Sequence, residues 1–532
     1  MVAELAAGSE RVRTAEVIAA LSLATDLGMG LPYEHGLQST LVALRLADRL
    51  GLDAETTSAT YYGCLLFYIG CTADAEISAE LFGDGSLLTH FGPVMFGSPA
   101  QTAAGIVRAL SDPDRSLPSN VLRVANRLPR ALRGHQRHIV ALCEVAVMLT
   151  DRLGLPAPVR DLFRAQTERW DGKGAPSGLR ADQIPLPMRI MHVARDATFQ
   201  CLLGGQEYAA RVIRERGGHA FDPTIASLLA DDAEHLLALD DETSAWDEVL
   251  DSEPGDRRNL DGPAIDRALA AIADFSDLIA PYLVGHSSGV ADLAVAAARA
   301  SGYPDAEVAS VRRAALIHDV GRVAVSAATW QKPAALTPHE WEQVRLHAYH
   351  SERVLCRSPY LAALVPVATS HHERLDGAGY HRGATAVTLT RPARLLAAAD
   401  TYHAMTEPRP YRPALAPADA ADALGEEART GRLDADAVDA VLSTAGHRVR
   451  RVAGPAGLTE REMQVVALLA RGLQTKQVAH TLGIAVKTAD RHVQNAYAKI
   501  GVSSRAATAL FAMEHGLMAW GEFPIAGGSR RS

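Results

Sequence analysis

Two pairs of neighbouring side chains, His318-Asp319 and His371-His372, each follow an apolar, helix-like run. Asp400 follows a third run of this kind, and His347 and His350 lie between the two pairs. Imidazole nitrogens and carboxylate oxygens that end apolar helical segments are the ligands a buried metal site needs. A single His-His pair is usually a surface accident, but this recurrence along the chain favours a metal centre.

An acidic, glycine-rich segment completes the pattern. It runs from His371 to His381, with the sequence HHERLDGAGYH, and His-Asp-x-Gly stands upstream at 318–321. In combination, these motifs resemble the HD-GYP family, metal-dependent phosphohydrolases whose known substrates are cyclic dinucleotides. The resemblance covers residues 260–445.

The resemblance implies a ligand set. Helix neighbours diverge by about 100°, so His318 and Asp319 can flank a metal pair, with Asp319 bridging. The set suits two divalent ions of iron or manganese better than one tetrahedral zinc. The implied mechanism is two-metal hydrolysis, in which an activated water attacks phosphorus, with Asp319 and Arg322 in the catalytic roles. The implied ligands are His286, His318, Asp319, His347, His371, His372 and Asp400.

Three positions depart from the family pattern. Tyr282 stands where some members carry a glutamate for a third metal, and Arg322 replaces a lysine while keeping its charge. His381 replaces the proline of Gly-Tyr-Pro, which predicts a looser substrate loop. Arg409 and Arg412 line the substrate mouth in one interpretation and only cap or solvate a loop in the other. The residues predicted to contact substrate are Asp376, Gly377, Gly379, Tyr380, Arg409 and Arg412.

Residues 11–240 repeat this pattern without most of its ligands. Phe67-Tyr68 stands where the second copy has His318-Asp319, Gln166-Thr167 replaces the His-His pair, and Arg195 replaces Asp400. We therefore predict a degenerate HD-type bundle that does not hold a metal pair. A structural or dimerising role and a sensor role both remain open for it.

The elements around these motifs predict an all-α fold. Hydrophobic residues make up 48% of the chain and charged residues 22%, which excludes a disordered protein. Five scattered cysteines fit a reducing compartment, and no stretch reads as a signal peptide or a membrane span, so we expect a cytoplasmic protein with no membrane partner. The predicted domains are the degenerate bundle at 11–240, a linker at 241–262, the HD-GYP-like bundle at 263–445, a basic linker at 446–455, a DNA-binding module at 456–517 and a tail at 518–532.

The C-terminal segment begins with a capping box, in which Thr459 precedes Glu462 by three residues. A short helix, a turn at Gly483 and a longer helix from Val486 follow, and the four-helix pattern resembles a LuxR-type helix-turn-helix. Residues 454–532 hold nine Lys and Arg against five Asp and Glu, a net charge of +4 in a chain of −9. Ala485 stands where a capping Ser or Thr is expected, at a cost of about 1 kcal/mol. The residues predicted to contact DNA are Lys476, Lys487, Thr488, Arg491, His492, Gln494, Lys499 and Arg505.

The sequence therefore predicts two HD-type bundles followed by a four-helix DNA-binding module. Its partners would be duplex DNA, a nucleotide and a second copy of the chain. The first interpretation is a DNA-binding transcription regulator whose two-metal site hydrolyses or senses a cyclic dinucleotide. The alternative is a cyclic-dinucleotide phosphodiesterase whose DNA-binding module is accessory.

Overall fold

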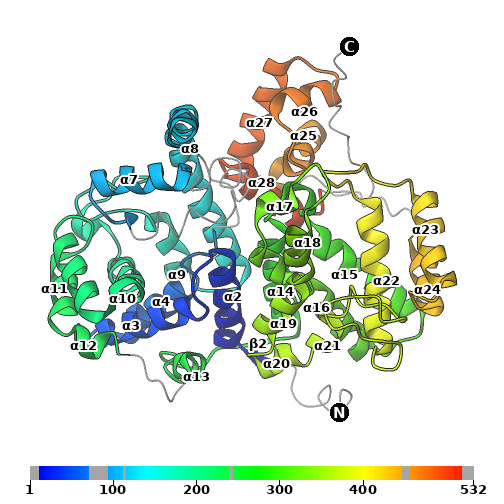
Figure 1. Cartoon of the computed structure of the whole chain (residues 1–532), viewed down its shortest axis with the longest axis horizontal. Helices are drawn as coiled ribbons and strands as arrows, with labels where there is room; N and C mark the ends of the chain where they lie inside the picture. Colours follow the sequence, from blue (N-terminus) through cyan, green and yellow to red (C-terminus); the bar gives the residue numbers. More distant parts are fainter. Residues whose placement is uncertain (1–10, 71–93, 112–115, 239–243, 446–454, 518–532) are drawn as a thin grey trace. The chain divides into compact units, whose positions relative to one another are not determined.

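A computed structural model describes residues 11–70, 94–111, 116–238, 244–445 and 455–517 (Figure 1). Regular structure in these residues is almost all helical. The strands there are β1 (Arg11–Arg13) and β2 (Asn259–Asp261), which pair antiparallel with Val12 opposite Leu260. The prediction of an all-α fold is thus confirmed. No helix in the described ranges is long and apolar enough to cross a membrane.

The described chain divides into two compact units, residues 11–265 and residues from 266 onward. In the first unit, α3 and α10 carry much of the core. Leu37, Leu41 and Met188 are almost completely buried, and the first two share one helix face because they lie four residues apart. The helices of this unit are α2 (Thr14–Gly28), α3 (His35–Arg49), α4 (Ala54–Leu65), α7 (Pro99–Leu110), α8 (Leu117–Arg152), α9 (Ala157–Leu162), α10 (Leu186–Arg216), α11 (Pro223–Asp231), α12 (Ala233–Leu236) and α13 (Ala245–Asp251).

The segment predicted as a linker at 241–262 is folded where it is described. It contains α13 and β2, and Tyr61 Oη donates a hydrogen bond to the Val249 carbonyl at 3.0 Å. Tyr62 Oη donates to Glu253 Oε1 at 2.6 Å, and Arg13 pairs with the same carboxylate at 2.7 Å. The linker prediction is wrong here because α13 is only seven residues long, although Trp246, Val249 and Leu250 are buried at helical spacing within it. The basic linker at 446–454 and the tail at 518–532 lie outside the described residues.

The helical bundle of the second unit surrounds the predicted metal site. Its long helices α15, α16 and α22 expose few of their apolar side chains, and Val290, Ile317 and Leu396 are fully buried. The helices of this bundle are α14 (Gly262–Asp277), α15 (His286–Ala300), α16 (Asp305–Ile317), α17 (Ala327–Trp330), α18 (Pro338–Arg345), α19 (His347–Leu355), α20 (Pro359–Ala362), α21 (Val365–Ala368), α22 (Arg391–Thr406), α23 (Pro417–Arg429) and α24 (Ala435–Thr444).

The two bundles of the predicted internal repeat share the same hydrogen bonds at corresponding helix starts and loops. Asp26 accepts a hydrogen bond from the amide of Gly36 at the start of α3, and Asp277 accepts one from the amide of Ser287 at the start of α15. A Cβ atom on Gly174 would lie 2.4 Å from Glu168 Cα, and one on Gly379 would lie 2.4 Å from Glu373 Cα. Glu168 accepts hydrogen bonds from the backbone amides of Ser177 and Gly178, and Glu373 accepts them from the amides of Arg382 and Ala384.

The C-terminal module consists of α25 (Glu460–Ala470), α26 (Thr475–Thr481), α27 (Val486–Ile500) and α28 (Arg505–Glu514). Leu469, Val478 and Val493 pack in its core. The predicted capping box is present, with Thr459 Oγ1 accepting from the Glu462 amide at 3.2 Å and Glu462 accepting from the Thr459 amide at 2.8 Å. Ala485 precedes α27 and supplies no side-chain cap, as expected.

We expect Thr459→Ala to lower the local stability of α25 by about 1 kcal/mol, because the substitution removes one half of the capping box. Amide hydrogen exchange in peptides covering α25 of the full chain should become about fivefold faster. Thr481→Ala, an exposed change at the end of α26, is the matched control and should leave exchange in α25 unchanged. Equal exchange in the Thr459→Ala variant and the wild type would contradict the assigned cap.

Candidate metal site and DNA-binding helix

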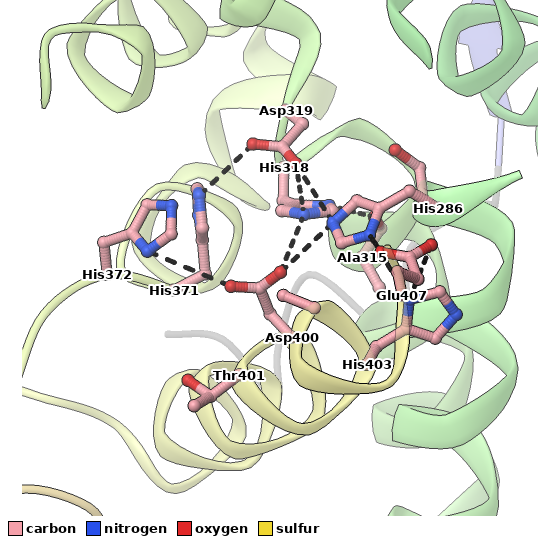
Figure 2. A network of polar contacts seen from close by, with 12 residues as sticks. His286, Ala315, His318, Asp319, His371, His372, Asp400, Thr401, His403 and Glu407 are labelled. Atoms are coloured by element: carbon pink, nitrogen blue, oxygen red, sulfur yellow. Dashed lines mark hydrogen bonds and ion pairs between the residues drawn. The ribbon is translucent and has the colours of Figure 1, made fainter. Parts of the chain in front are cut away.

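The predicted ligands come from five helical segments and meet inside the second bundle, where Figure 2 labels all of them except His347. His286 begins α15, His318 and Asp319 directly follow α16, and His347 begins α19. The His371-His372 pair follows α21, and Asp400 lies within α22. All are buried except His372, which is partly exposed. The structure therefore brings the whole predicted ligand set together.

The carboxylate of Asp319 lies between two groups of histidines. Its Oδ1 atom is 3.2 Å from His347 Nε2 and 3.3 Å from His371 Nε2. Its Oδ2 atom is 2.7 Å from His318 Nε2 and 3.5 Å from His286 Nε2. This is the arrangement expected of a carboxylate that serves two metal positions, one through each oxygen.

Three of the imidazole rings are oriented by backbone carbonyl groups. The Nδ1 atom of His318 lies 2.6 Å from the Ala315 carbonyl, and that of His371 lies 2.7 Å from the Ala368 carbonyl. His347 makes the equivalent contact at 2.5 Å. A carbonyl oxygen can only accept a hydrogen bond, so Nδ1 carries the hydrogen and Nε2 is left to face the site. Fixing the second nitrogen in this way is typical of histidines that bind metal.

The donor atoms at the centre fit a metal. Among the described residues, His318 Nε2, both carboxylate oxygens of Asp319 and Asp400 Oδ1 are buried and have close ion-pair neighbours but no well-oriented hydrogen bond. Buried polar atoms without partners are costly, and metal ions would satisfy them. Side chains close enough to share an ion form the groups His318-Asp319-His371, His286-His318-Asp400 and His347-His371-His372.

The charges of these side chains depend strongly on one another. Burial lowers the pKa of His318, but Asp319 and Asp400 outweigh this effect and raise it to about 9. Burial lowers the pKa of His371 to about 4. Burial would raise the pKa of Asp319, yet Arg322 and His318 hold it well below its usual value. The central carboxylate is therefore ionised and available as a ligand.

Arg322 reaches the site, as predicted. Its Nη2 atom lies 2.6 Å from Asp319 Oδ2 and 3.3 Å from His286 Nε2, and the residue is only 5% exposed. Its Nε and Nη1 atoms are buried and have no hydrogen-bond partner among the described residues. A guanidinium in this position neutralises part of the acidic charge and keeps donors for a further oxyanion.

The sequence reasoning missed a second layer around His286. Glu407 Oε2 lies 2.8 Å from His286 Nδ1, and His403 Nδ1 lies 3.2 Å from Glu407 Oε1 (Figure 2). Glu407 and His403 are both buried, and their four-residue spacing at the end of α22 was the available signal. The carboxylate accepts from Nδ1 of His286, so the Nε2 atom of that ring also faces the site.

The predicted substrate loop is held from several sides. His381 Nε2 lies 3.0 Å from Glu352 Oε2, and Arg382 also pairs with Glu352. This acidic partner on α19 ties the loop at the position where the family has proline. Tyr380 lies at the site, stacked on His372 with ring centroids 4.7 Å apart.

The other predicted substrate residues shape the backbone. Asp376 Oδ1 accepts a hydrogen bond from the Ala378 amide at 2.9 Å, and Gly377 has φ +78°. Gly379 is required by its close approach to the backbone of Glu373. These three residues shape the backbone of the loop.

The two arginines that follow α22 differ from each other. Arg412 donates hydrogen bonds to the carbonyls of Ala404 and Met405 at 2.6 and 3.3 Å, so it caps the end of α22, which was the alternative interpretation. Arg409 pairs with Glu407 at 3.0 Å and lies over the ring of Tyr282 at 5.2 Å. Only Arg409 therefore lies beside the ligand network.

In the first bundle, a cation and aromatic rings occupy the positions that correspond to the ligands. The Arg195 guanidinium lies 4.1 Å from the centre of the Tyr68 ring and 4.9 Å from that of Phe67. Its Nη1 atom donates to the Cys64 carbonyl at 3.1 Å, and Gln166 donates to the Phe67 carbonyl. Within the described part of this unit, no three metal-type side chains lie close enough to share an ion.

The predicted DNA contacts concentrate on one exposed face of α27. Lys487, Arg491 and Gln494 are exposed there, and His492 is half-buried. Lys476 is exposed on α26. Thr488 on α27 and Arg505, the first residue of α28, are half-buried.

Lys499 is instead engaged within the module. Its ammonium pairs with Glu462 at 2.6 Å and donates to the Gly457 carbonyl at 3.0 Å. The structure therefore gives Lys499 a role in holding α25 to α27 rather than in contacting DNA.

Comparison with known proteins also separates the helical bundles from the C-terminal module. A protein-family model described as "HD domain" matches residues 112–225 and 268–437, which together exceed half of the chain. A second, "Bacterial regulatory proteins, luxR family", matches residues 456–512. The chain therefore belongs to the HD domain family and carries a LuxR-type module at its C-terminus.

The chain is also similar to several phosphodiesterases. A 3'3'-cGAMP-specific phosphodiesterase of Vibrio cholerae is 28% identical over 416 residues, covering 77% of this chain and 90% of that protein. A cyclic di-GMP phosphodiesterase of Pseudomonas aeruginosa is 39% identical over 132 residues, covering 25% of this chain and 32% of that protein. The crystal structure of a cyclic GMP-AMP specific phosphodiesterase of Vibrio cholerae matches with a TM-score of 0.56 and 25% identity, covering 82% of this chain and 98% of that one. The chain is a metal-dependent phosphohydrolase, as the sequence predicted.

We expect elemental analysis of the purified chain to find close to two transition-metal ions, because the second bundle has a complete ligand set and the first does not. The double substitution His318→Ala with Asp319→Ala should remove them, since it deletes the central carboxylate and one imidazole. Gln166→Ala, at the corresponding position in the first bundle, should leave the metal content unchanged. A wild-type protein isolated free of metal from metal-replete cells would contradict the assignment.

Proposed function

We propose that the second bundle hydrolyses a phosphodiester bond of a cyclic dinucleotide and that the C-terminal module binds duplex DNA as part of a transcription regulator. The observation that carries the enzymatic part is the position of Asp319, whose two carboxylate oxygens each face two histidines. The relatives named as cyclic-dinucleotide phosphodiesterases support the choice of substrate class.

The side chains of the bundle would divide the work between holding metal and holding substrate. Two ions of iron or manganese, bound by the histidines with Asp319 and Asp400, would activate a water molecule and neutralise phosphoryl oxygens. Arg322 keeps buried N–H groups that have no hydrogen-bond partner in the described part of the chain and can donate to an oxygen of the phosphodiester. Tyr380 covers His372 and limits access of bulk water on that side.

Arg322 gives the sharpest test of this reaction. Arg322→Ala should lower kcat for a cyclic dinucleotide by about 10²-fold, because it removes a donor aimed at developing charge. Arg322→Lys should retain more activity, since the charge remains. Turnover is measured on a panel of cyclic and linear nucleotides, with Gln166→Ala as the control that keeps wild-type rates. A metal-loaded wild type that hydrolyses no cyclic dinucleotide would sink the proposal.

The regulatory part rests on the exposed polar face of α27. A helix-turn-helix places its second helix in the major groove, and such modules usually read two half-sites as a dimer. The exposed side chains of Lys487, Arg491 and Gln494 are therefore offered to base edges, and Lys476 to phosphates. We infer that the chain works as a homodimer when it binds DNA.

The alternative is a phosphodiesterase whose DNA-binding module is accessory. The two interpretations differ in whether nucleotide binding changes DNA binding. In a regulator, the nucleotide must bind two arrangements of the dimer with different affinities. Saturating cyclic dinucleotide should then change the affinity for operator DNA by about 5–150-fold. Equal affinities with and without the nucleotide would favour the alternative.

We expect binding to duplex DNA to weaken steeply as salt rises, because lysine and arginine contacts release condensed counterions. Arg491→Ala should reduce the preference between DNA sequences, whereas Lys476→Ala should weaken binding to all sequences alike. Lys499→Ala should chiefly destabilise the module, given its pairing with Glu462. Fluorescence anisotropy at several salt concentrations measures these effects, and no binding by the wild type at low salt would refute the DNA-binding role.

A further inference from the structure

Helix α18 presents an exposed indole beside the metal site. Trp341 is 45% exposed, although large aromatic side chains are usually buried. Its ring centroid lies 6.4 Å from that of Tyr380, at an interplanar angle of 74°. The Arg345 guanidinium, on the same helix, lies 5.5 Å from the centre of the Tyr380 ring. Two side chains of α18 therefore converge on the one aromatic residue of the substrate loop.

A series of rings connects this surface to the metal ligands. Tyr380 stacks on His372 at 4.7 Å and 28°, and it lies 6.2 Å from the ring of His347. Trp341 is thus the next ring outward from Tyr380. A ligand that has its phosphate at the histidines and carries a flat group one unit away would meet Trp341 and Tyr380.

Helix α18 is fixed in place before any ligand binds. Thr337 and Glu340 form a capping box at its start, and Lys332 Nζ donates to both Glu340 oxygens at 2.8 and 2.6 Å. The helix ends at Arg345, two residues before the ligand His347. Its side chains are therefore positioned relative to the metal site by a short, continuous piece of backbone, which lowers the entropic cost of binding.

The two side chains suit a nucleobase. Stacking of a base on an aromatic side chain contributes about 1–3 kcal/mol. Arg345 makes an exposed pair with Glu342 at 3.3 Å, and such pairs contribute little, so its fork of N–H groups can turn to a ligand. That fork matches the O6 and N7 acceptors of guanine, whereas adenine places an amino donor in the position of O6.

We propose that Trp341 and Arg345 form a subsite for one guanine base of the cyclic dinucleotide, with Trp341 supplying the stacking surface and Arg345 the preference for guanine over adenine. This inference rests on the proposed phosphodiesterase function and names the part of the substrate that binds outside the metal centre. The scissile phosphate lies at the histidines, and the base attached to its ribose lies against α18.

The test is calorimetric binding of phosphorothioate analogues of cyclic di-GMP and cyclic di-AMP, which resist hydrolysis, to the metal-loaded full chain. Trp341→Ala should weaken both analogues about 5–150-fold, and Trp341→Phe should restore most of the loss. Arg345→Ala should reduce the preference for the guanine analogue about tenfold. Metal content should stay at the wild-type value in all three variants. Leu202→Ala, which removes an exposed apolar side chain of α10 in the first bundle, is the control and should bind as the wild type does.

Unchanged affinity for both analogues in Trp341→Ala would overturn the stacking surface. An unchanged guanine preference in Arg345→Ala would overturn the specificity role. Turnover is measured separately, so a wild type that binds the analogues through Trp341 but cleaves no cyclic dinucleotide would refute the proposed hydrolysis and leave the subsite in place. A wild type that binds neither analogue would refute both.

Discussion

The carboxylate of Asp319 is fully buried, and a carboxylate removed from water costs several kcal/mol unless positive charge or hydrogen bonds replace its hydration. The rest of the second bundle places hydrogen-bond donors and positive charge around this carboxylate. Helices α15, α16 and α19 each direct an imidazole Nε2 atom at the carboxylate, and Arg322 supplies a permanent cation at 2.6 Å. Among the described residues, His318 Nε2, both carboxylate oxygens of Asp319 and Asp400 Oδ1 are buried atoms of this site that a metal would bind.

The first bundle lacks the central carboxylate and therefore does not need to surround it with compensating groups. Phe67 and Tyr68 stand where the histidine and the central aspartate would be, so no carboxylate occupies the central position there. Arg195 replaces the second acidic ligand, and its guanidinium lies against the two rings. Burial raises the pKa of Asp26, which is held by the Gly36 amide, to about 7. The scaffold of the repeat thus persists without the group that makes the second copy a metal site.

The sequence predicted the ligands because short motifs fix them: neighbours such as His318-Asp319 must lie together whatever the fold does elsewhere. It predicted the capping box of α25 for the same reason. It did not reveal Glu407 as the partner of His286, because that contact joins residues 121 positions apart. The tie between His381 and Glu352, and the capping role of Arg412, are likewise tertiary contacts. Propensity and periodicity carry no information on such contacts, and a seven-residue helix such as α13 is too short to show a period.

We expect one of the two related bundles to hold metal, whereas the other holds Arg195 in place of an acidic ligand. Anomalous diffraction from crystals of the full chain, collected on both sides of the iron and manganese absorption edges, tests it directly. The account predicts two peaks, both beside Asp319, and none near Arg195. A peak beside Arg195, or a second bundle without any peak in crystals grown with metal, would contradict it.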